Sequence, residues 1–371
     1  MTMKGVLLTL SATALLSTML GCEDKPKETK AAEADAGRAT TTAVDPKLAE
    51  AVAAAGTKAG KGDASAAAED GPPERGVFED GKADTQLKRG EPPKIVLGEA
   101  GSEPRAVLAG DVPAGWKQSG SFDVTLRLGR AQLPGMTISV NLEAPKPKAP
   151  AAAAPGAAPA PVVAPAEDGA PLSAKVTEVK LTADTAGPQG KELAAQLAKI
   201  KGSSIHFRVV SGVGTDFSLE LAKGAAPDLE MILRAVAEAL ESTTIGFPKE
   251  AVGPGGYWLV TTRGMVSGAE VVSYRLVKLE KAAGEELTFS VNTKRYSVST
   301  KLEFAGLPPG AELDQFQSTT EARLTLHKGE PLARTGTSKQ TFAAALIPAG
   351  GGDQRLGMQS VADVAITLGK K

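Results

Sequence analysis

The chain has 371 residues, with 42 basic and 43 acidic side chains and a net charge of −1 at pH 7. This balance excludes the broad basic field that attracts nucleic acid, so we expect no nucleic-acid partner. Two histidines and one cysteine are too few for a metal site built from His or Cys ligands.

The first 21 residues predict a secretion signal. Lys4 is the only charge before an apolar run from Val6 to Leu20, and a short basic end followed by such a run is typical of a signal peptide. The run is shorter than the roughly 20 residues that a membrane-spanning helix needs. We therefore expect residues 1–21 to be a signal peptide rather than a permanent span.

The single cysteine, Cys22, follows this run in the stretch MLGC. Gly21 and Cys22 resemble the lipobox of bacterial lipoproteins, in which the thiol receives diacylglycerol and a peptidase cuts in front of it. A lone thiol also has no disulfide partner. The resemblance implies attachment to a membrane through Cys22 and a place in the bacterial envelope, on the outer membrane facing the periplasm. Glu23 and Asp24 leave retention on the inner membrane open, and an ordinary signal peptide cut elsewhere is the alternative.

Two stretches of biased composition are predicted to be disordered. Residues 22–83 contain mainly Ala, Gly, Pro and charged residues, which cannot bury enough surface to offset the entropy of ordering. We expect this stretch to be a tether. Residues 144–171 are rich in Pro and Ala and favour an extended surface insertion. The rest of 84–371 is expected to form a single β-rich domain.

Period-two alternation of apolar and polar residues predicts the strands of this domain. Phe122, Val124 and Leu126 fall on one face of a strand, and the residues between them are polar. Such strands have one buried and one wet face, an arrangement that antiparallel sheets tolerate. The same alternation occurs at 136–143, 205–210, 216–221, 286–292, 321–327 and 362–368.

Helices are predicted at only two places. Residues 227–242 carry an apolar stripe, with Glu230, Arg234 and Glu238 on the opposite side, and residues 190–202 form a shorter candidate. One helix, about 10 Å wide, covers only part of a broad apolar sheet face. We therefore expect a mainly β fold, in which a curved antiparallel sheet or half-barrel wraps around one main helix, with a second short helix.

The stretch IGFPKEAVGPGGYWLV (245–260) follows the main predicted helix and precedes a tyrosine-bearing strand at 268–280. This order resembles an uncharacterised family of bacterial lipoproteins with the pattern Pro-x-x-x-Val-Gly-x-Gly-x-x-Trp. The resemblance covers roughly residues 84–370. It implies a β-rich fold similar to the half-barrels of lipoprotein carriers and sensors, and no established activity. The matching residues are Pro248, Glu250, Val252, Gly253, Gly255 or Gly256, and Trp258, with Ala251 where the family often has proline.

Signatures of catalysis are absent from the sequence. No GxSxG, HExxH or GxxxxGK[ST] motif occurs. His206 and His327 fall on the polar side of alternating strands, as solvated surface imidazoles do. The GPGGYW segment lacks the lysine and the following helix of a phosphate loop, so we interpret it as a turn that lets Trp258 enter the core. We expect no enzymatic activity, no cofactor and no metal.

Two functional hypotheses remain. In the first, the envelope lipoprotein presents an apolar cavity that binds a lipid, another hydrophobic small molecule or an envelope protein segment. In the second, it is a structural envelope lipoprotein with a filled core and no ligand. An apolar hollow of roughly 300 Å³ or more would favour binding. The predicted cavity-lining residues are Leu229, Ile232, Leu233, Val236, Leu240, Phe207, Phe217, Leu219 and Phe289.

Overall fold

The computed structural model describes residues 72–145, 169–182, 188–266, 269–301, 310–349 and 355–369. The predicted signal peptide, Cys22, most of the predicted tether and most of the predicted insertion lie outside these residues. All described residues belong to one compact unit.

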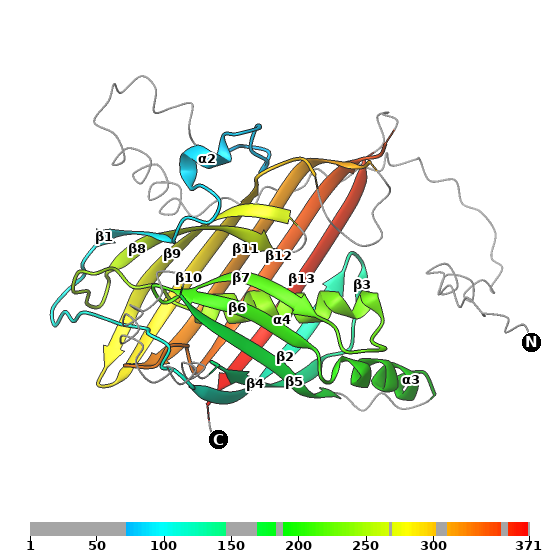
Figure 1. Cartoon of the computed structure of the whole chain (residues 1–371), viewed down its shortest axis with the longest axis horizontal. Coiled ribbons are helices and arrows are strands. Elements are labelled where there is room, and N and C mark those ends of the chain that lie inside the picture. The colour runs from blue at the N-terminus through cyan, green and yellow to red at the C-terminus, as the bar shows by residue number, and fades with distance from the viewer. Residues whose placement is uncertain are drawn as a thin grey trace, which may run out of the picture. The chain divides into compact units, whose positions relative to one another are not determined.

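Thirteen strands form one antiparallel sheet (Figure 1). Their order across the sheet is β1-β8-β9-β10-β11-β12-β13-β2-β4-β5-β6-β7, and β3 pairs with β2. The strands are β1 (Lys94–Glu99), β2 (Lys117–Leu128), β3 (Ala131–Gln132), β4 (Met136–Glu143), β5 (Ala170–Leu181), β6 (Ser204–Val210), β7 (Val213–Glu220), β8 (Tyr257–Val266), β9 (Ala269–Ala283), β10 (Glu286–Ser297), β11 (Glu312–His327), β12 (Thr335–Ile347) and β13 (Leu356–Leu368).

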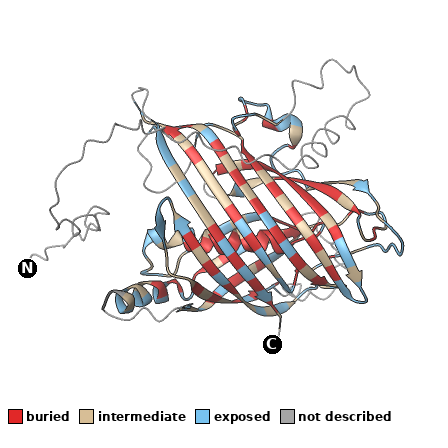
Figure 2. Ribbon diagram, turned by 180° about the vertical axis from the view of Figure 1, so that it is seen from behind, coloured by how far each residue is buried: buried red, intermediate tan, exposed pale blue. Residues whose placement is uncertain are grey.

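The predicted alternation is seen directly in the burial of the strands. Along β4, Met136, Ile138 and Val140 are buried, and the residues between them are half-buried or exposed. Buried and exposed residues likewise alternate along the long strands in Figure 2. One face of the sheet therefore carries the core, as the period-two pattern predicts.

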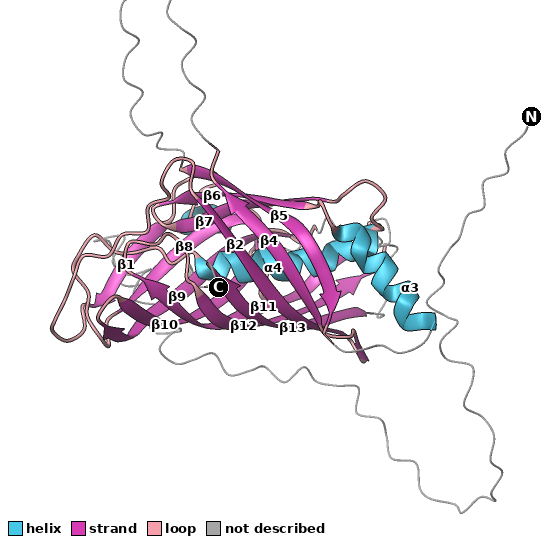
Figure 3. Cartoon of the chain, turned by 90° about the horizontal axis from the view of Figure 1, so that it is seen from below, coloured by secondary structure: helices cyan, strands magenta, loops and turns pink. Residues whose placement is uncertain are grey.

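The sheet curves around α4 (Glu230–Thr243), which Figure 3 shows inside the bend of the strands. This helix contacts β2, β7, β11, β12 and β13. The sheet is open, because β1 and β7 form its two edges, and within the described chain no ladder joins them. The prediction of a curved antiparallel sheet around one main helix is confirmed.

The other helical segments of the described chain are short. The 3₁₀ turn Pro227–Leu229 leads into α4, and α3 (Pro188–Leu197) continues into the 3₁₀ helix η1 (Ala198–Ile200), as expected for the second short helix. The helix α2 (Ala83–Gln86) was not expected.

The folded region begins before the boundary predicted at residue 84. Phe78 and Ala83 are buried in a small cluster with Tyr274 and Tyr296 on the outer face of β9 and β10. Val77 forms a β-bridge with Ser297. Apolar residues at these positions anchor the segment to the sheet, although the composition around them is that of a tether.

Candidate functional site

The apolar stripe of α4 faces the concave side of the sheet, as the sequence predicts. Ile232, Leu233 and Leu240 are at most 2% exposed. They pack in the main core cluster together with inward side chains of the strands around the helix. The helix therefore stabilises the curved sheet by covering part of its concave side.

The structure brings the nine predicted cavity-lining residues together in this one cluster. Six of them are buried, and Leu229, Phe217 and Leu219 are partly buried at its margin. The rings of Phe207 and Phe217 stack with centroids 4.8 Å apart. Each of the nine thus has apolar neighbours on the concave side of the sheet.

A buried ionic network lies at the C-terminal end of α4. Glu241 accepts hydrogen bonds from Arg275 Nη2 at 2.8 Å and from Arg295 Nη2 at 2.7 Å. Arg275 Nη1 also donates to the carbonyl oxygen of Thr244, and Arg295 Nη1 donates to Thr320 Oγ1. The network therefore ties the end of the helix to β9, β10 and β11.

The two arginines determine the charge state of Glu241. Burial alone would raise the pKa of this carboxyl, but the nearby positive charges of Arg295 and Arg275 outweigh it and lower the pKa below its ordinary value. The Nε atoms of both arginines are buried and have no hydrogen-bond partner among the described residues. The network is thus charged and buried, and within the described residues the two Nε–H groups take no part in its hydrogen bonds.

This network belongs to a polar band that crosses the concave face. Thr293, Ser318 and Ser338 are buried in it, and Gln340 Nε2 donates to the carbonyl oxygen of Ala235 on α4. Polar side chains at these inward positions interrupt the apolar pattern of β10, β11 and β12. The band was not predicted from the sequence.

A second apolar region lies beyond the band, and we call it the distal cluster. Along β11, the inward positions run from Phe316 through Ser318 and Thr320 to Leu324, that is, from the distal cluster across the band to the main cluster. Phe342 and Met358 pack against the distal cluster and are only partly buried. Its buried members are Ala269, Val271, Leu313, Phe316, Ala344 and Leu346.

The motif of residues 248–258 forms a turn that leads into β8. Trp258 is fully buried, and its Nε1 donates to the carbonyl oxygen of Gly246 at 2.7 Å. Gly255 has a φ of +83°, and a Cβ at Gly253 would lie 1.9 Å from the carbonyl oxygen of Ser102. Gly255 therefore permits the positive φ of this turn, and Gly253 permits the close approach of Ser102. The prediction that the turn lets Trp258 enter the core is confirmed.

The two histidines lie on the surface. His206 is exposed, with Nε2 3.4 Å from a carboxylate oxygen of Glu220, and His327 is half-buried at the end of β11. Among the described residues, no group of three or more His, Cys, Asp or Glu side chains could hold a metal ion. The helices in this part of the chain are also too short or too polar to cross a membrane.

Among solved structures, the chain has a weak similarity to lipovitellin. No protein-family model and no curated protein matches the chain. A solved structure of lipovitellin, described by its lipid–protein interactions, aligns with 69% of this chain at 12% sequence identity and a TM-score of 0.39. The alignment covers 25% of the lipovitellin chain, so this chain spans about a quarter of the length of that protein.

Proposed function

We propose that this chain is a lipid-anchored, non-enzymatic protein of the bacterial envelope whose concave sheet face binds a hydrophobic ligand, either a lipid acyl chain or an apolar protein segment. The proposal rests on the distal cluster. The helix α4 packs mainly on β2, β7, β11, β12 and β13, and it reaches β9 and β10 through the ion pairs of Glu241. The distal cluster is separate from the core around the helix. The concave face thus has more apolar surface than α4 covers.

The distal cluster is a better candidate for the binding surface than the wall of α4. Leu233 and Leu240 of the helix are fully buried, so a ligand at these positions would have to displace the helix. Phe342 and Met358 are only partly buried. A ligand that covered these two side chains would gain hydrophobic free energy without opening the core.

Membrane attachment through Cys22 is the second part of the proposal. Its support is the apolar run of residues 6–20, the MLGC ending and the charged sequence that follows. The likeness of residues 245–260 to an uncharacterised family of bacterial lipoproteins agrees with it. An outer-membrane location facing the periplasm follows from this attachment as part of the same proposal.

Phe342→Asp is expected to weaken binding of a fluorescent fatty acid at least about tenfold, because it places a carboxylate on the apolar surface of the distal cluster. The ring of Phe342 lies 5.8 Å from that of Phe316, edge to face. Ala343→Asp is the matched control, since the next residue of the strand points to the opposite face. Titration of the probe, followed by its fluorescence, measures both variants.

Equal binding by the wild type and Phe342→Asp would contradict a site at the distal cluster. A wild type that binds no acyl probe at concentrations below aggregation would contradict the ligand proposal itself. Circular dichroism of each variant establishes that a loss of binding is not a loss of fold.

Cys22→Ser is expected to release the protein into the soluble periplasmic fraction or to leave it unprocessed, because a hydroxyl cannot replace the thiol that receives the diacylglycerol. Metabolic labelling with an alkyne fatty acid tests this directly. The wild type should carry the label and the variant should not. Equal labelling of the two would rule out Cys22 as the site of attachment.

The second candidate function is that of a structural envelope lipoprotein with a filled core. The observation that favours it is the burial of the predicted lining residues, of which Leu233, Val236 and Phe289 are fully buried. In that case the concave face would bind only the protein's own side chains. The fatty acid titration separates this alternative from the first.

A further inference from the structure

A lysine-rich depression lies between β5, η1 and the turn after β7. It has a volume of about 730 Å³ and a wide opening. Four of the residues that line it are lysines, namely Lys175, Lys199, Lys201 and Lys223. None of the described residues that line it is acidic. In a chain whose net charge is only −1, this is a local concentration of positive charge.

Hydrogen bonds join the backbone segments that carry the lysines. Gly202 N donates to Val176 O and Val176 N donates to Ser203 O, which joins the end of η1 to β5. Ala222 N donates to Ser203 Oγ at 2.8 Å, which joins the turn after β7 to the same place. Ser203 is fully buried. The backbone positions of the lysines are therefore fixed relative to one another.

Three of these lysines point outward, because the residues next to them in the sequence point into the core. Lys175 lies between Ala174 and Val176, which are at most 1% exposed, and Lys199 and Lys201 flank the fully buried Ile200. On the adjoining strands, Glu178 is paired with Lys180 at 2.8 Å, and Glu220 points to His206 of the neighbouring strand at 3.4 Å. The positive charge of the depression is thus left facing solvent.

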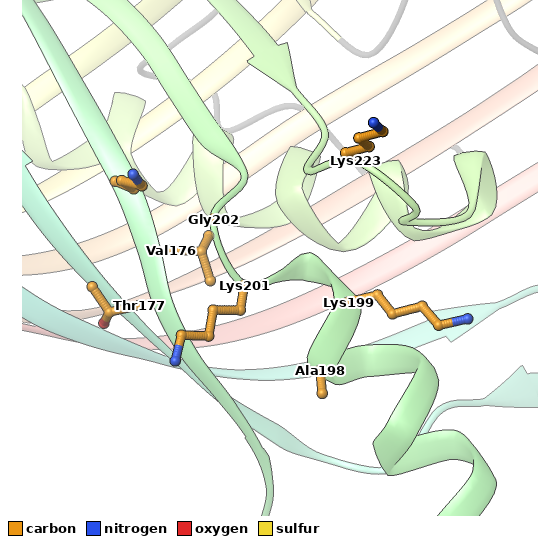
Figure 4. Close-up of a pocket in the computed structure, with 8 residues that line it drawn as sticks. Val176, Thr177, Ala198, Lys199, Lys201, Gly202 and Lys223 are labelled. Carbon is orange, nitrogen blue, oxygen red and sulfur yellow. The ribbon is translucent and has the colours of Figure 1, made fainter.

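The lysine side chains spread over the surface and do not converge on one point. In Figure 4, Lys199 and Lys201 extend to opposite sides of η1, and Lys223 rises from the neighbouring turn. Lys199 Nζ also donates to Gln196 Oε1 at 2.8 Å. One small anion could not contact all four ammonium groups, whereas separate phosphates distributed over a surface could.

We propose that this lysine surface binds the phosphate headgroups of an anionic bilayer. The choice of a bilayer over a soluble polyanion rests on the membrane attachment proposed above. A lipid-anchored chain is held close to headgroups, and each lysine near an anionic membrane adds favourable free energy that decays within a Debye length. The lysine surface would then turn this side of the sheet toward the membrane.

The test measures binding of the mature chain, which begins at residue 22 and carries Cys22→Ser, to vesicles, so that neither lipid attachment nor the apolar run of residues 6–20 plays a part. The vesicles contain phosphatidylglycerol and phosphatidylcholine, or phosphatidylcholine alone, and bound protein is measured by co-sedimentation. One variant replaces Lys175, Lys199, Lys201 and Lys223 by glutamine. The control replaces four exposed lysines from other parts of the fold, with the same change in net charge: Lys94, Lys249, Lys281 and Lys339.

Binding to the anionic vesicles is expected to fall about fivefold for each lysine removed from the depression, and to fall as salt is raised. The control variant should stay within about threefold of the parent, because scattered charges add little beyond the Debye length. Equal losses in both variants, or no preference of the parent for anionic vesicles, would overturn the proposal. Binding to inorganic polyphosphate without binding to vesicles would also overturn it in favour of a soluble polyanion. None of these outcomes depends on the acyl probe.

Discussion

Replacing Glu241 by alanine is expected to lower the free energy of unfolding by about 3–5 kcal/mol, because it leaves two buried guanidinium groups without their carboxylate. Arg275 and Arg295 are at most 2% exposed, and each donates a hydrogen bond to Glu241. The Nε atoms of both arginines have no partner among the described residues. Water cannot replace the lost interaction unless the core opens. Urea unfolding of the two proteins measures the difference.

Glu238→Ala is the matched control for this prediction. Glu238 lies on the same helix, with a carboxylate oxygen 3.7 Å from Arg295 Nη1, but its side chain is 15% exposed. Its loss should cost no more than about 1 kcal/mol, since an ion pair of this length in contact with solvent contributes little. A cost below about 1 kcal/mol for Glu241→Ala as well would show that solvent reaches the network.

The triple variant Glu241→Leu, Arg275→Met, Arg295→Met tests whether the network contributes to folding stability or to ligand binding. A buried ion network is often no more stabilising than well-packed apolar side chains of similar volume. We therefore expect the triple variant to regain most of the stability that Glu241→Ala loses. If it does so and still fails to bind the acyl probe, the network acts in binding rather than in folding.

Acid should weaken the same network in the wild type. The pKa of Glu241 is lower in the folded chain than its ordinary value, so the ionised carboxylate adds stability above the unfolded-state pKa of about 4.3. That contribution is lost as the pH falls through the folded-state pKa. The Glu241→Gln variant lacks this contribution.

The fold could be predicted from the sequence because its main signal is local. Along β2, Phe122, Val124 and Leu126 alternate with polar residues, and this pattern alone indicates one buried face. The helix 230–243 shows its apolar stripe within a single segment. Strands without a clean alternation were missed, such as β1 and β12, and the start of β5 lies within the predicted insertion.

The polar band could not be predicted, because it depends on register across strands. Arg275 on β9 faces Thr293 on β10, and Arg295 on β10 faces Ser318 on β11. These pairings place the two arginines as diagonal neighbours under the end of α4. In the sequence alone, Arg275 and Arg295 at inward positions break the alternation, and such breaks are the only signal that could have indicated the network.

The lysine surface could not be predicted either, because its residues lie in separate segments of the sequence. Lys175 lies on β5, Lys199 and Lys201 lie on or just after η1, and Lys223 lies in the turn after β7. The sequence places charged residues on both sides of each of them. Only the folded chain brings the four lysines together around one depression.

Leu233→Ala is expected to lower the free energy of unfolding by about 2–5 kcal/mol, because it leaves a cavity in a packed core. Leu233 is fully buried in the main cluster, between α4 and the concave face of the sheet. Met231 is on the same helix but 36% exposed, so Met231→Ala should cost no more than about 1 kcal/mol. Chemical unfolding of both variants, with unchanged dependence on denaturant, gives the two values.

The size of the Leu233→Ala effect bears on the function. A full loss means that the side chains around α4 close the core, and any ligand must then bind elsewhere on the concave face, where the distal cluster is the candidate. A loss well below 2 kcal/mol would place Leu233 on the wall of a hollow, as the sequence hypothesis of an apolar cavity requires. The full loss together with no binding of the acyl probe by the wild type would decide for a structural envelope protein, because neither region of the concave face would then accept a ligand.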